Sequence, residues 1–124
     1  MKPRVLTYAE SPEQLWIGLD AEGMRRKVFK LVSGELTGAE HLIGGVTVFS
    51  PGEESSVHVH EGSEEINFVL SGHGEFITDD GVEPFGPHQI MYVPQGMRHG
   101  HRNTGTEPLI LGFVYSPQAE LPST

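Results

Sequence analysis

The sequence predicts an all-β domain of antiparallel strands. Its apolar residues come in short runs, and glycine and proline, which make up 16 and 9 of the 124 residues, separate these runs. Strands joined by tight turns produce this pattern, whereas helices need longer periodic segments. A chain of this length suits one domain with one hydrophobic core. No internal repeat or domain boundary stands out in the sequence.

The first third of the chain gives mixed signals. Residues 4–8 are expected to form a short strand. Ser11 and Pro12 predict the start of a short helix, with the serine as N-cap and the proline at the first helical position. Residues 24–32 mix basic and apolar side chains and predict a strand, and residues 33–38 have the composition of a turn.

The rest of the chain alternates strands with turns. Strong strand signals, rich in β-branched and aromatic residues, cover residues 43–49, 66–70, 75–78, 90–93 and 109–115. Weaker strand signals cover residues 57–60, 82–85 and 99–103. Pro84 limits the second of these to edge or irregular pairing.

The centre of the sequence is a His-x-His pattern followed by a carboxylate. His58 and His60 alternate with valines, so a strand would project both from one face. Four residues including a glycine link His60 to Glu65, which is a hairpin signal. In that hairpin Glu65 would lie opposite His60, and Asn67 opposite His58, all on one face. Two imidazoles and a carboxylate on rigid strands are a metal-ligand set.

This stretch and a second cluster near residue 99 resemble the two sequence motifs of the cupin family. The first motif, G-x5-H-x-H-x4-E-x6-G, is matched throughout by Gly52, His58, His60, Glu65 and Gly72. The second, G-x5-P-x-G-x2-H-x3-N, is matched from its proline onward by Pro94, Gly96, His99 and Asn103. His88 stands where the second motif begins with glycine. The resemblance covers residues 43 to 116.

The resemblance implies a small antiparallel β-barrel in jelly-roll arrangement, with a metal ion inside its mouth. It implies that one divalent transition metal ion is bound by His58, His60, Glu65 and His99. Iron or manganese is favoured, and nickel, zinc or copper also suit these ligands. It further divides the domain into N-terminal strands that pair with a partner copy in a homodimer (1–40) and the barrel core (41–116). The tail (117–124) carries two prolines and is expected to be loose.

The favoured function is that of a metalloenzyme with dioxygenase-like chemistry on a small molecule that carries adjacent oxygens. A metal-dependent isomerase, lyase or decarboxylase is an alternative, as is a cupin that binds a small molecule or sugar without catalysis. His101 is a candidate acid–base residue or a mouth residue, and Tyr92 a cavity phenol or a core residue. Asn67 is a candidate for the substrate pocket or a strand residue bonded to backbone. Arg98 is expected at the surface.

Composition excludes several other functions. The formal net charge is −9, which disfavours binding to nucleic acid or to anionic membranes, because both need basic patches. The chain has no cysteine, so disulfides, thiolate metal sites and cysteine nucleophiles are excluded. No signal-peptide pattern or transmembrane-length apolar segment is present, so a cytoplasmic protein is expected. The partner expected from this pattern is a small-molecule ligand or substrate.

Overall fold

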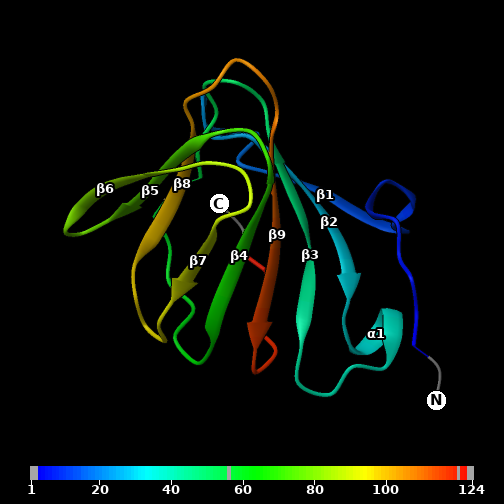
Figure 1. Cartoon of the computed structure of the whole chain (residues 1–124). Coiled ribbons are helices and arrows are strands. Elements are labelled where there is room, and N and C mark those ends of the chain that lie inside the picture. The colour runs from blue at the N-terminus through cyan, green and yellow to red at the C-terminus, as the bar shows by residue number, and fades with distance from the viewer. Residues whose placement is uncertain (1–2, 56, 120, 123–124) are drawn as a thin grey trace.

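The computed structural model, which describes residues 3–55, 57–119 and 121–122, contains two antiparallel sheets (Figure 1). The larger sheet has the strand order β1-β2-β3-β9-β4-β7, and the smaller has the order β6-β5-β8. Their bounds are β1 Glu13–Ile17, β2 Arg26–Val32, β3 Ile43–Phe49, β4 Glu64–Ser71, β5 Gly74–Thr78, β6 Gly81–Phe85, β7 Ile90–Val93, β8 His99–Asn103 and β9 Leu109–Ser116. Two helical turns are η1, Tyr8–Glu10, and α1, Gly34–Thr37.

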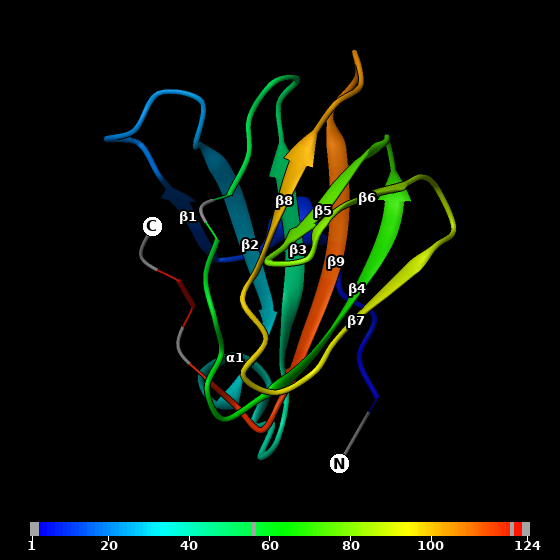
Figure 2. The ribbon, with the colours of Figure 1, turned by 90° about the vertical axis from the view of Figure 1, so that its left-hand side faces the viewer.

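The two sheets pack face to face around a hydrophobic core. Viewed from the side of the smaller sheet, β5, β6 and β8 lie in front of the strands of the larger sheet (Figure 2). The core cluster draws on both sheets and contains Phe49, Val69, Phe85, Met91, Leu109 and Leu111, with Phe76 packed against it. The all-β jelly-roll prediction is confirmed, although hydrogen bonds between the described strands do not join the two sheets into a closed barrel.

A second cluster fills the other end of the larger sheet. It contains Ile17, Val28, Ile43, Phe113 and Tyr115. Ala119 and Leu121 of the tail, which was expected to be loose, pack against this cluster. Residues 120, 123 and 124 of that tail lie outside the described residues. The helical segments of the described residues are single turns, too short to span a lipid bilayer.

The structure corrects two predictions in the N-terminal region. Residues 4–7 form no strand, and the residues after Ser11 and Pro12 form strand β1 instead of a helix. The Ser11 hydroxyl donates a hydrogen bond to the Lys30 carbonyl of β2, 2.5 Å away, and so anchors the start of β1 beside that strand. The local preference for a helix is outweighed here, because β1 pairs with β2 along its whole length.

The predicted hairpin between residues 57–60 and β4 is also wrong. Both edges of β4 are already occupied, by β7 and by β9. The segment before β4 instead runs along β8, where His58 forms an isolated bridge with His99. The backbone nitrogens of His58 and His99 each donate to the other's carbonyl oxygen, at 2.8 and 2.9 Å. The His58 and His60 side chains still meet the Glu65 carboxylate in one cluster, although the partner strand is not the one expected.

His88 takes over the role of the glycine that is missing from the second motif. Its backbone has φ 71°, the left-handed conformation that glycine adopts without strain. Its amide donates to the Val69 carbonyl oxygen at 3.0 Å, so the turn into β7 stays tied to β4. The turn before β7 therefore has a left-handed residue at this position, supplied by His88.

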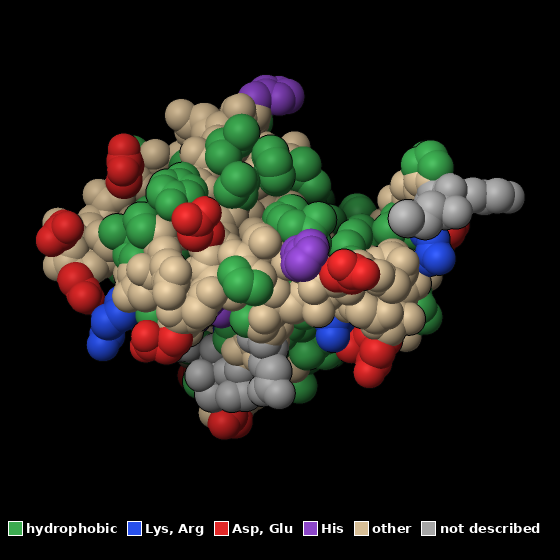
Figure 3. All heavy atoms as spheres, turned by 90° about the horizontal axis from the view of Figure 1, so that it is seen from below, with side chains coloured by type: hydrophobic (Ala, Val, Ile, Leu, Met, Phe, Trp, Pro, Cys, Tyr) green, Lys and Arg blue, Asp and Glu red, His purple; other side chains and the backbone are tan. Residues whose placement is uncertain are grey.

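The surface combines acidic and apolar regions. Seen from below, acidic side chains are spread around the edge of the molecule, and hydrophobic side chains gather between them (Figure 3). On β4 the alternation sends the apolar side chains Ile66, Phe68 and Leu70 outward, where they are 38 to 53% exposed. The inward positions at the start of the same strand are the polar Glu65 and Asn67. On β4, polar side chains thus face inward and apolar side chains face outward, and the inward polar residues lie where the metal site is expected.

Candidate metal centre

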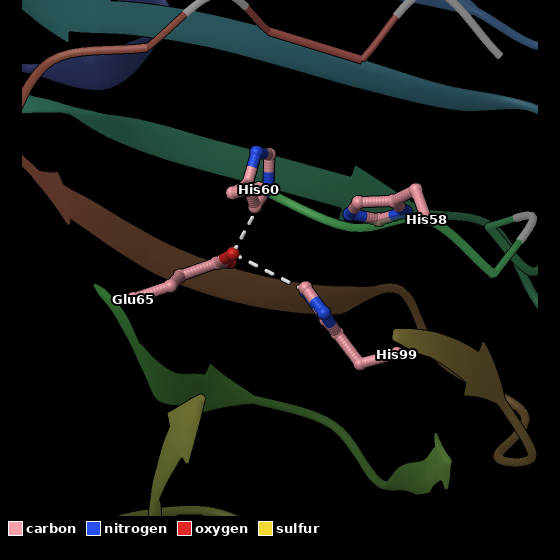
Figure 4. Close-up of side chains that lie close together, drawn as sticks. All are labelled: His58, His60, Glu65 and His99. Atoms are coloured by element: carbon pink, nitrogen blue, oxygen red, sulfur yellow. Dashed lines mark ion pairs between the residues drawn. The ribbon is translucent and has the colours of Figure 1, made fainter. Parts of the chain in front are cut away.

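Four side chains from three segments converge inside the molecule (Figure 4). His58 and His60 come from the connection between β3 and β4, Glu65 from the second position of β4, and His99 from the first position of β8. One nitrogen or oxygen of each side chain lies within 4.8 Å of those of the other three. Two ligands on opposite sides of one ion are about 4.2 Å apart. The cluster is therefore close to the size that a single ion needs.

Three atoms at the centre of this cluster are buried without a hydrogen-bond partner. Oε1 of Glu65 lies 3.1 Å from Nε2 of His60 and 3.2 Å from Nε2 of His99. Among the described residues, none of these three atoms makes a hydrogen bond of acceptable geometry. Buried polar atoms without partners cost free energy, so native proteins pair them or use them as ligands. The donor set of imidazoles and a carboxylate fits one transition metal ion.

The tautomer of His99 suits metal binding. Its ring is fully buried, and its Nδ1 lies 3.1 Å from the carbonyl oxygen of Met97. A carbonyl oxygen only accepts hydrogen bonds, so Nδ1 carries a proton, and in the neutral ring the lone pair is then on Nε2. This arrangement of a backbone partner behind the ring is common for histidines that bind metals.

A chain of hydrogen bonds holds the other oxygen of Glu65. Nδ2 of Asn67 donates to Oε2 of Glu65 at 2.7 Å, and Oδ1 of Asn67 lies 2.9 Å from Nε2 of His101. Burial by itself raises the pKa of the Glu65 carboxyl, but His60, His99 and the Asn67 amide outweigh it. The pKa of Glu65 therefore lies well below its ordinary value, and the carboxyl is ionised at neutral pH.

His101 is a buried, neutral member of this hydrogen-bond chain. It lies two residues after His99 on β8 and shares its inward face. Since the Asn67 amide nitrogen faces Glu65, its oxygen faces His101, and Nε2 of His101 must donate the hydrogen bond. Burial lowers the pKa of His101 to about 3, and the nearby Glu65 charge only partly offsets this effect. The ring is therefore a hydrogen-bond donor at neutral pH.

A cavity of about 40 Å³ adjoins the cluster. His58, Glu65, Asn67 and His101 line it, as do two residues that the sequence reasoning missed, Arg26 and Tyr115. The Tyr115 ring centroid lies 4.3 Å from that of His60, and burial raises the pKa of its phenol. Alternation could have indicated both residues. Arg26 lies two residues before the inward-facing Val28, and Tyr115 lies two residues after the inward-facing Phe113.

The structure does not bring Tyr92 into the site. The strand β7 alternates so that Met91 and Val93 point inward, and the Tyr92 side chain is 56% exposed on the outer face. Both expectations for Tyr92, as a cavity phenol and as a core residue, are therefore corrected. Arg98 is exposed as expected, and its guanidinium lies 3.5 Å from Asp79. The convergence of His58, His60, Glu65 and His99 agrees with the ligand set that the sequence motifs imply.

Comparison with known proteins identifies the family. The sequence profile described as "Cupin domain" matches residues 45–115. "Polyketide synthase CurC" of Streptomyces cyaneus is 32% identical over 123 residues, covering 99% of this chain and 75% of that protein. "Protein SchB" of Streptomyces halstedii is 37% identical over 92 residues, covering 74% of this chain and 67% of that protein.

A solved structure shares the fold. The crystal structure of a predicted oxalate decarboxylase from Thermotoga maritima superposes with a TM-score of 0.78 at 23% identity, over 93% of this chain and all of that chain. At this identity the likeness concerns the fold alone. The family profile matches more than half of the chain, and the conclusion is that the chain belongs to the cupin domain family.

Proposed function

We propose that the protein is a metal-dependent enzyme that oxidises a small, oxygen-rich molecule of polyketide type in a dioxygenase-like reaction. The observation that carries the proposal is the buried ligand atoms of His60, Glu65 and His99, which have no hydrogen-bond partner among the described residues and lie beside a cavity. Four protein ligands leave two positions of an octahedral ion for other molecules. When bound, the metal supplies Lewis-acid and oxygen-activating chemistry.

The substrate class follows from chelation and from the relative named as a polyketide synthase. Polyketides carry carbonyl groups on alternate carbons, so neighbouring oxygens of one molecule can occupy two positions on one ion. The cavity has a volume of only about 40 Å³, which suits the chelating end of a substrate. The remainder of a larger molecule would lie outside the cavity.

The residues of this chain have separate roles in the proposal. His58, His60, Glu65 and His99 hold the ion. Asn67 fixes the free oxygen of Glu65, and His101 fixes Asn67 through its Nε2 hydrogen. With a pKa of about 3, His101 is a poor proton acceptor, so it acts here as a positioning residue.

An oxygen-uptake experiment tests the proposed reaction. The protein is loaded with Fe(II) without air, and oxygen consumption is followed with 2,4-pentanedione or catechol as the probe substrate. We expect uptake of one oxygen molecule per substrate consumed, and none above background for a His58→Ala, His99→Ala double variant. Conversion without oxygen would favour the isomerase, lyase or decarboxylase alternative. Chelation without any conversion would favour a binding protein.

Substitution of His101 tests its positioning role. Replacing it with Leu removes the hydrogen bond to Asn67, and we expect turnover to fall by about 10- to 100-fold, the usual range for residues behind metal ligands. His101→Gln keeps a donor and should recover part of that loss. Metal content is measured in both variants. Unchanged turnover in the leucine variant would contradict the role.

We also propose that the protein is a homodimer. Supporting this, β1 lies at the edge of the larger sheet and has a strand neighbour on one side only among the described strands. An unpaired strand edge can pair with the same edge of a second copy. We expect light scattering at micromolar concentration to give twice the mass of the chain, and a monomeric mass would contradict the proposal.

A further inference from the structure

The C-terminal tail is held against the rest of the molecule directly after β9. The hydroxyl of the buried Ser63 donates a hydrogen bond to the carbonyl oxygen of Pro117, 2.6 Å away. The side-chain amide of Gln118 donates to the carbonyl oxygens of Ala39 and Leu42, at 2.7 and 3.0 Å. These bonds join the start of the tail to two separate parts of the fold, the segments that precede β3 and β4.

Beyond these hydrogen bonds the tail returns to the interior. Ala119 and Leu121 pack against the second cluster, which contains Val28 of β2 and Phe113 of β9. Leu121 and Pro122, both half-buried, also line the cavity beside the candidate metal centre. In the close-up the tail passes beside β2, above the four ligands (Figure 4). The tail is therefore part of the cavity wall.

The lining of this cavity is polar in one part and apolar in another. The polar part contains side chains of the metal centre and of its hydrogen-bond chain: His58, Glu65, Asn67 and His101. The apolar part contains members of the second cluster: Ile17, Val28, Phe113 and Tyr115. Oxygens that chelate the ion would lie in the polar part. A hydrocarbon group bonded beside them gains free energy by packing in the apolar part, which Leu121 adjoins.

The cavity is so small that a single side chain of its wall decides which groups fit. Its volume of about 40 Å³ has room for only a few water-sized groups. A closely packed wall admits extra carbon atoms only at the cost of strain. Leu121 comes from the tail, so shortening its side chain enlarges the cavity without changing any residue of the two sheets.

We propose that Leu121 limits the size of the group that the substrate carries beside its chelating oxygens, at the end that enters the cavity. Leu121 contacts this end group while the chelating oxygens occupy the ion. A methyl group is then preferred over a branched one. The inference rests on the proposed function, because it takes a metal-chelating molecule as the substrate. It narrows that class to molecules whose chelating pair ends in a methyl-sized group.

Two matched probes test this size limit. The first, 2,4-pentanedione, has a methyl group at each end, and the second, 2,6-dimethyl-3,5-heptanedione, has an isopropyl group in each of these places. Both probes are symmetric, so either end can enter the cavity with the same result. Affinities are measured by calorimetry on Mn(II)-loaded protein without oxygen, for the wild type and Leu121→Ala. Metal content and circular dichroism are checked for each protein.

Leu19→Ala provides the matched control. Leu19 lies in the turn between β1 and β2, is 63% exposed, and does not line the cavity. The control therefore makes the same change of side chain at a position away from the site.

We expect the wild type and Leu19→Ala to bind 2,4-pentanedione at least about tenfold more tightly than the branched probe, the effect that an excess of one or two carbon atoms has in a closed pocket. Leu121→Ala should gain at least about tenfold in affinity for the branched probe and keep its affinity for 2,4-pentanedione. Damage to the fold would not produce such a gain. If the alanine variant does not fold, Leu121→Val should show a smaller gain in the same direction.

The outcomes separate this inference from the proposed function. Equal affinity of the wild type for both probes would overturn the size limit and leave the proposed function standing. An unchanged preference in Leu121→Ala, or an equal loss of affinity for both probes with the metal retained, would do the same. Binding of neither probe by metal-loaded wild type would overturn the proposed function and the size limit with it.

Discussion

Replacing Glu65 with Gln is expected to lower the metal affinity of the protein by at least about 100-fold, beyond the loss seen for residues that only support a ligand. The carboxylate is the one anionic member of the ligand cluster, and its Oε1 lies 3.1 and 3.2 Å from the His60 and His99 nitrogens. A neutral amide would remove that charge and direct either a weak ligand or an N–H group at the ion.

Glu64 provides a matched control for this substitution. It is the preceding residue on β4, it is exposed, and Glu64→Gln removes the same charge from the same strand. Metal content is measured by mass spectrometry after dialysis, and circular dichroism verifies that each variant is folded. Near-stoichiometric metal in Glu65→Gln would show that the Glu65 carboxylate is not a ligand that the metal needs.

Replacing Asn103 with Leu is expected to lower the free energy of unfolding by about 3 kcal/mol or more, because several buried polar groups lose their partners. Asn103 is 1% exposed. Its Nδ2 donates to the carbonyl oxygens of Phe49 and Glu107, and its Oδ1 accepts from the Gly105 amide. One side chain therefore ties the end of β3 to the turn between β8 and β9.

Urea unfolding of metal-free protein measures this loss without a contribution from metal binding. Gln95→Leu is the control, because it removes an exposed amide side chain from a turn and should change the free energy of unfolding by no more than about 0.5 kcal/mol. If Asn103→Leu shifts the midpoint no further than the control, the hydrogen bonds of Asn103 do not stabilise the fold.

The cupin resemblance and the alternation of residues were sufficient to predict the ligand cluster. His58, His60, Glu65 and His99 have the motif spacing, and the structure brings them together. Asn67 and His101 were placed on the same face, and the structure links them in one hydrogen-bond chain. The hairpin used to align Glu65 with His60 was wrong, yet the four side chains still converge, because the segment before β4 runs along β8, which carries His99.

The sequence was a poorer guide where a residue's surroundings come from distant strands. Tyr92 was a candidate for the interior, but its alternation with Met91 and Val93 on β7 turns it outward. Arg26 and Tyr115 were overlooked because both are far from the metal ligands in the sequence, and alternation indicates only that they face inward with Val28 and Phe113. Only the packing of β2 and β9 around the same cavity brings them to the site.

The sequence by itself determined the fold class, the strands from residue 43 onward apart from the segment 57–60, and the ligand positions, because these depend on local alternation and on fixed motif spacing. The tertiary structure decided which strands pair. The segment after Ser11, which was expected to be a helix, forms β1 because it pairs with the edge of β2. It also decided which charges share the cavity. Pairing and burial depend on contacts between residues far apart in the chain, and no local pattern encodes those contacts.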